Sequence, residues 1–78
     1  MSTYDMVAAR RAAAALQEHI AQRHNGKRVP DLSGPVLREA VVELMVDLKH
    51  LLVRDDWTAM LTELAGEAVD RWAEEEED

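Results

Sequence analysis

The chain has 78 residues, the size of one small domain. It contains no cysteine, which excludes disulfide bonds, thiolate zinc sites and cysteine nucleophiles, and fits a reducing compartment. The net charge of -7 argues against a general nucleic-acid-binding protein, because phosphate groups repel an acidic surface. We find neither a membrane-spanning segment, which needs about 20 apolar residues, nor the apolar region of a secretory signal at the start of the sequence. We therefore expect a cytoplasmic protein.

The first predicted helix spans residues 3–24, with Ser2 or Thr3 as its N-cap. Its interior is rich in alanine, the strongest helix former. Helical spacing places five apolar side chains on one face: Met6, Ala9, Ala13, Leu16 and Ile20. Asn25-Gly26 is predicted to end this helix, because glycine accepts the left-handed backbone conformation that closes helices.

A loop is predicted over residues 26–34. Pro30 disfavours a helical conformation at Val29. Ser33-Gly34-Pro35 is typical of the start of a helix. We expect Val29 and Leu32, the spaced apolar residues of this loop, to pack against the core.

The second predicted helix spans residues 35–54 and has a broad apolar face. That face comprises Leu37, Ala40, Val41, Leu44, Met45, Leu48, Leu51 and Leu52. Its width suits contact with two neighbours, so we expect this to be the central helix. A second, narrow stripe of Val42, Val46 and Val53 lies about 180° from Leu44. Either the first helix covers these valines, or they form a partner or homodimer interface.

The third predicted helix spans residues 56–74, with Asp55 or Asp56 as its cap. Its inward face comprises Trp57, Leu61, Leu64, Ala65, Ala68 and Trp72. Because the link to the second helix is very short, the two helices are expected to be antiparallel. These elements predict an all-α protein, an antiparallel three-helix bundle forming a single domain over residues 1–73. The acidic run 74–78, which holds nothing apolar, is predicted to be a disordered tail.

Charge is distributed unevenly along the chain. Residues 1–39 contain six Lys or Arg and four Asp or Glu, whereas residues 40–78 contain three Lys or Arg and twelve Asp or Glu. Near the end of the first helix, a basic patch of Arg23, Lys27 and Arg28 lies beside His19 and His24. Positive charge near the C-terminal end of a helix interacts favourably with the helix dipole, so the patch could serve helix stability alone. The alternative is that it binds a partner rich in carboxylate or phosphate groups.

The sequence contains residues for two kinds of chemical site, a metal site and a hydroxyl nucleophile. Glu39, Glu43, Asp47 and His50 share one side of the second helix. Ligands from a single helix do not converge on a cation, so we expect a solvated acidic stripe and no metal or other cofactor. The hydroxyl residues fall in no nucleophile-elbow or phosphate-loop motif. We therefore expect a protein that is not an enzyme, with a helical Mg²⁺-dependent or Mn²⁺-dependent enzyme as the least favoured alternative.

An acidic face on the third helix is the most informative feature for function. Glu63, Glu67 and Asp70 lie close to one line opposite the tryptophan face, and Arg71 is the sole basic residue predicted in that helix. Glu43 and Asp47 add acidic residues on the second helix. Rows of carboxylates can imitate a nucleic-acid backbone and occupy a Lys/Arg-rich groove of a protein. The simpler interpretation is a solvated polar face that maintains solubility.

The second helix, from Leu37 through the Asp47-Leu48-Lys49-His50 segment, carries a loose Leu-x-x-Leu-type pattern. Together with the ending RWAEEEED, this half of the chain resembles small acidic all-helical proteins of phages and mobile elements. That class includes anti-CRISPR and anti-restriction inhibitors, so the resemblance implies a non-enzymatic inhibitor or adaptor that binds a host protein. The acidic residues named above would dock on the basic, nucleic-acid-binding surface of such a partner, with no direct contact to nucleic acid or membrane. The alternative is a homodimeric structural or regulatory module that uses the valine stripe.

Overall fold

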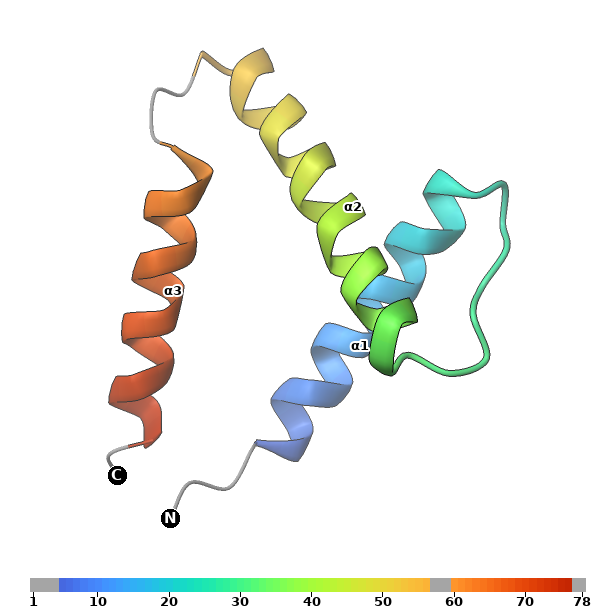
Figure 1. The fold of residues 1–78 in the computed structure, drawn as a ribbon, viewed down its shortest axis with the longest axis horizontal. Coiled ribbons are helices and arrows are strands. Elements are labelled where there is room, and N and C mark those ends of the chain that lie inside the picture. The colour runs from blue at the N-terminus through green and yellow to red at the C-terminus, as the bar shows by residue number, and fades with distance from the viewer. Residues whose placement is uncertain (1–4, 57–59, 77–78) are drawn as a thin grey trace. The chain divides into compact units, whose positions relative to one another are not determined.

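The computed structural model describes residues 5–56 and 60–76. Within them lie three helices and no strand: α1 (Met6–Arg23), α2 (Gly34–Arg54) and α3 (Leu61–Glu76), which Figure 1 shows in chain order. The predicted all-α class is confirmed. None of these described helices combines the length and the apolar character needed to cross a bilayer.

The described part of the chain divides into two compact units. One contains the described residues up to Val46, and the other contains those from Asp47 onward. Helix α2 runs through the boundary, so its first half belongs to one unit and its second half to the other. The antiparallel bundle and the single domain over residues 1–73 therefore remain predictions.

Helix α1 begins at a carboxylate rather than at a hydroxyl. The Asp5 side chain accepts hydrogen bonds from the Val7 and Ala8 amides, each at 3.0 Å. The predicted caps, Ser2 and Thr3, lie outside the described residues. Asp5 is the better acceptor at this position, because its negative charge also interacts favourably with the helix dipole.

The other end of α1 closes as predicted, through two residues in the left-handed conformation. Asn25 has φ 58° and Gly26 has φ 86°. The Gly26 amide donates to the Ala21 carbonyl at 2.7 Å, and the His24 amide donates to the Ile20 carbonyl at 2.9 Å. The bond from Gly26, which reaches back five residues, is the 6→1 hydrogen bond that defines a Schellman motif, and it satisfies a carbonyl of the last turn of α1.

The buried residues lie in the first unit, where α1 meets the first half of α2. Leu16, Ile20 and Ala40 are buried, and Val29, Leu32 and Leu44 pack against them. The prediction that Val29 and Leu32 anchor the loop is confirmed. Ala40 is small enough to let α1 approach α2 closely, which brings the end of α1 near the acidic residues of α2.

Much of the apolar surface predicted to face inward is not covered. On α2, Ala40 is buried, Leu44, Met45 and Leu52 are half-buried, and Leu37, Val41, Leu48 and Leu51 are exposed. On α3, Leu61, Leu64 and Ala65 are half-buried, whereas Ala68 and Trp72 are exposed. Among the described residues, only Leu16, Ile20 and Ala40 are buried apolar side chains.

The start of α3 differs from the prediction. Asp55 and Asp56 do not cap it, because their amides donate to carbonyls of the last turn of α2, and Asp56 has φ 55°. Helix α3 begins at Leu61, and Trp57 lies outside the described residues. Its other end extends through Glu76, so the structure does not confirm a tail that is disordered from residue 74. Residues 77 and 78 lie outside the described part.

Candidate functional site

The acidic row of α3 (Glu63, Glu67, Asp70 and Glu74) lies on one side of an amphipathic helix. All four side chains are exposed. Their spacing places four carboxylates along about 16 Å of the helix axis. Apolar residues occupy the opposite face of α3, so this row points away from the face that α3 can bury.

One cation lies beside this row. Arg71 donates a hydrogen bond to Glu67, four residues earlier. Both side chains are exposed, and such pairs contribute little stability in water. Glu67 is therefore partly neutralised within its own helix, whereas Glu63 and Asp70 lie one turn away on either side.

Glu43, also predicted to contact a partner, is held by the protein itself. One carboxylate oxygen lies 2.6 Å from Arg23 Nε and 2.8 Å from His24 Nε2. The Glu43 side chain is only 19% exposed. Asp47 is half-buried and also makes an interaction of its own. Among the five predicted contact residues, the three on α3 are thus the exposed ones.

The predicted basic patch is also largely paired with acids of the chain. Arg28 Nη2 lies 3.0 Å from Glu18 Oε2, and Arg23 binds Glu43 as described. The Glu18 pKa is lowered, first by the hydrogen bond from Gln22 and then by Arg28 through hydrogen bonding and charge. Lys27 is exposed. These ion pairs join Arg23 at the end of α1 to α2, and Arg28 of the loop to α1. Binding of the patch to an acidic partner remains a prediction.

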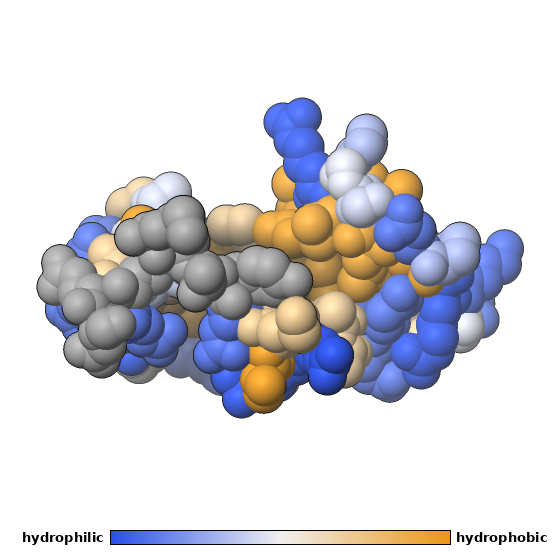
Figure 2. All heavy atoms as spheres, turned by 90° about the horizontal axis from the view of Figure 1, so that it is seen from below, coloured by the Kyte–Doolittle hydropathy of each residue, from blue (hydrophilic) through white to orange (hydrophobic). Residues whose placement is uncertain are grey.

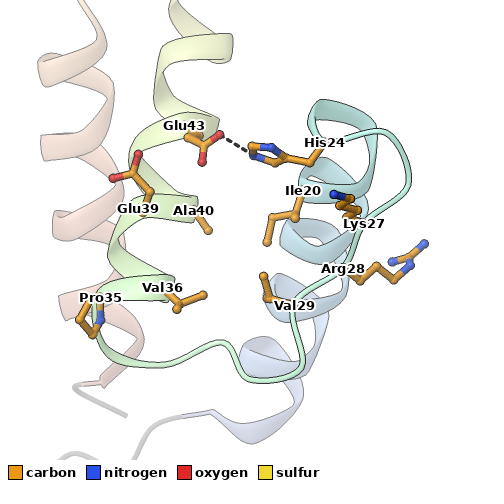
Figure 3. Close-up of a pocket in the computed structure, with 10 residues that line it drawn as sticks. All are labelled: Ile20, His24, Lys27, Arg28, Val29, Pro35, Val36, Glu39, Ala40 and Glu43. Carbon is orange, nitrogen blue, oxygen red and sulfur yellow. Dashed lines mark hydrogen bonds and ion pairs between the residues drawn. The ribbon is translucent and has the colours of Figure 1, made fainter.

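A cleft of about 530 Å³ opens between α1, the loop and the first half of α2. Figure 3 shows Ile20 and Val29 on one side, pointing toward Val36 and Ala40 on the other, with the His24–Glu43 contact at one end. Its volume lies within the range of small-ligand pockets, about 300–1,000 Å³. The complete lining also includes charged residues at the rim and a proline: Lys27, Arg28, Pro35 and Glu39.

The chemistry of this cleft is that of an apolar hollow. Its lining contains no Ser, Thr, Tyr or Cys, so it offers no hydroxyl or thiol nucleophile. Among the described residues, no group of three or more His, Cys, Asp or Glu side chains is arranged to hold a metal ion. Glu39, Glu43, Asp47 and His50 do not form such a group, and Glu43 faces Arg23 and His24 instead.

A side-chain clamp that the sequence analysis missed fixes one wall of the cleft. Gln17 Nε2 donates to the Val29 carbonyl at 2.7 Å, and the Val29 amide donates to Gln17 Oε1 at 3.2 Å. The Gln17 side-chain amide thereby satisfies both backbone hydrogen-bonding groups of Val29. A signal was available, because Gln17 lies next to the apolar face of its helix, where an amide needs hydrogen-bond partners.

The valine stripe of α2 lies at the surface. Val42, Val46 and Val53 are 45%, 43% and 64% exposed. In Figure 2, apolar side chains are visible at the surface of the molecule. Within the unit that contains α1, Val42 and Val46 thus remain at the surface, and a partner or homodimer interface on the stripe stays a prediction.

Comparison of the chain with protein-family models, with curated proteins and with solved structures gives no match. The resemblance to small proteins of phages and mobile elements thus gains no support from known relatives.

Proposed function

We propose that this protein is a non-enzymatic inhibitor or adaptor that binds a protein partner. Its acidic row on α3 docks on a basic surface that the partner uses for nucleic acid. The observation that supports this most directly is the exposed alignment of Glu63, Glu67 and Asp70 opposite the apolar face of α3.

The density of charge in the row suits this role. Four carboxylates over about 16 Å of the helix axis stand about 5.5 Å apart on average. One strand of a DNA duplex carries one phosphate per about 3.4 Å of axis. A groove of Lys and Arg side chains built for a phosphate backbone therefore meets a row of negative charges on α3 that is less dense than the phosphates of one strand but of the same order.

Glu43 and Asp47 take a smaller part in the proposed docking. Glu43 would have to release Arg23 before it met a basic partner, and this exchange of one ion pair for another gains little. The α3 row loses less on docking, because the ion pair that it forms with other described residues, Glu67 with Arg71, is exposed. We assign the main contact to Glu63, Glu67 and Asp70.

Charge reversal tests the proposal. Tagged wild-type protein is used to capture partners from a lysate, and the captured partner is then washed with increasing NaCl or with a short DNA duplex. The triple variant Glu63→Lys, Glu67→Lys, Asp70→Lys should lose capture by about 100-fold while its circular dichroism remains helical. The DNA duplex should release the partner from the wild-type protein, because both compete for the same groove.

A matched control separates the row from net charge. The variant Asp31→Lys, Asp55→Lys, Glu75→Lys changes the net charge equally but leaves the acidic row intact. It should keep most of the capture. Equal loss in both triple variants, or tight capture by the Glu63, Glu67 and Asp70 variant, would show that the row is not the docking surface.

A further inference from the structure

Helix α2 exposes apolar side chains on two of its sides. Eight of its large apolar residues are at the surface: Val36, Leu37, Val41, Val42, Val46, Leu48, Leu51 and Val53. Contiguous apolar surface left exposed on a small protein commonly marks a contact with another molecule. Since three buried apolar side chains are all that the described residues provide, this small chain gains from a further contact.

We propose that a second copy of the chain covers the valine stripe, with the two α2 helices antiparallel about a two-fold axis that passes the helix at the height of Leu44, on the opposite side from that residue. In such a pair, positions equally distant from Leu44 on either side face each other. Val42 then meets Val46 of the other copy, and Val46 meets its Val42. The centre of the contact therefore consists of two Val42–Val46 pairs, both from the exposed valine stripe.

The charges on either side of the valines fit the same axis. Glu39 and Lys49 are both exposed and lie five residues before and five residues after Leu44. Helical spacing places both at the edges of the valine stripe. The antiparallel pair therefore brings Glu39 of each copy to Lys49 of the other. A parallel pair would instead bring Glu39 to Glu39 and Lys49 to Lys49, which repel.

Two more positions agree with this register. Pro35 and Val53 are each nine residues from Leu44, so both ends of the contact join apolar residues. Glu43 lies next to the axis, where two copies of a carboxylate would repel. Its ion pair with Arg23 within each copy neutralises that charge in advance. The symmetry of this helix favours a second copy as the occupant over an unrelated partner.

Cysteine cross-linking tests the register, because the natural chain has no cysteine that could interfere. An equimolar mixture of the Val42→Cys and Val46→Cys variants should form a disulfide-linked dimer under mild oxidation, whereas each variant alone should form at least tenfold less. A parallel dimer would cross-link each variant with itself. That outcome would overturn the proposed arrangement.

Sedimentation equilibrium tests the dimer itself. The wild-type chain should dimerise, and Val46→Lys should weaken dimerisation at least 100-fold, because it places two lysines at the centre of the contact. Val69→Lys is the control, since Val69 is 61% exposed on α3 and off the stripe. It should leave dimerisation unchanged. A wild-type chain that stays monomeric at millimolar concentration would refute the proposal.

A charge exchange keeps the test decisive where Val46→Lys does not fold. Glu39→Lys alone and Lys49→Glu alone should each weaken dimerisation about tenfold, because each creates two repulsive contacts per dimer. The double variant Glu39→Lys, Lys49→Glu should restore the wild-type affinity. Failure of the double variant to recover would contradict the antiparallel register.

Discussion

Replacing Gln17 with leucine removes the two hydrogen bonds that hold the loop at Val29, with little change in volume. These bonds measure 2.7 and 3.2 Å and both involve half-buried groups. Net hydrogen bonds contribute about 0.5–1.5 kcal/mol each, and half-buried groups left without partners add to the loss. We expect the free energy of unfolding to fall by about 2 kcal/mol. For a domain of this size, that lowers the melting temperature by roughly 8–16 °C.

Urea unfolding followed by circular dichroism measures this loss, and amide hydrogen exchange at Val29 locates it. Gln22→Leu is the matched control, because the Gln22 side chain donates to Glu18 on the exposed side of the same helix. It should cost less than about 0.5 kcal/mol. If Gln17→Leu matches the control in stability and the Val29 amide keeps its protection, the clamp does not hold the loop.

Two further predictions concern the end of α1 and its surface. Asn25→Val should lower stability by about 1–2 kcal/mol in urea unfolding, because a β-branched residue is strained at φ 58°; an unchanged midpoint would contradict this. NMR titration should find the Glu18 pKa below its ordinary value, and Gln22→Ala and Arg28→Ala should each raise it. Because the folded-state pKa is depressed, the small stabilisation from Glu18 is present above the unfolded-state pKa and is lost as the pH falls through the folded-state pKa; a Glu18 pKa that neither variant moves would refute the assignment.

Features that depend on neighbours along the chain were predictable. The bounds of α2 were predicted within one residue, because Ser33-Gly34-Pro35 is a local start signal and the apolar period continues to Val53, next to the last residue of the helix. The close of α1 at Asn25 and Gly26 follows from backbone preference alone. The anchoring of Val29 and Leu32 follows from their apolar character in a short loop.

Features that depend on distant parts of the chain were not predictable. Gln17 and Val29 are twelve residues apart, and Arg23 and Glu43 are twenty apart, so no periodic pattern connects them. The late start of α3 was missed for a different reason. Asp55 and Asp56 are good capping residues for a following helix, but their amides close the preceding one instead.

Salt distinguishes the two contacts proposed for this chain. Docking through the acidic row of α3 depends on exposed charges, whose interactions are screened as the Debye length falls from about 30 Å at 0.01 M salt to about 3 Å at 1 M. The contact of Val42 with Val46 depends mainly on apolar burial, which salt does not screen. Capture of a partner should therefore fail at 1 M NaCl while the cross-linked yield of the Val42→Cys and Val46→Cys mixture persists. If capture survives and the dimer dissociates, charge holds the two copies together and apolar surface holds the partner. Both assignments would then be reversed.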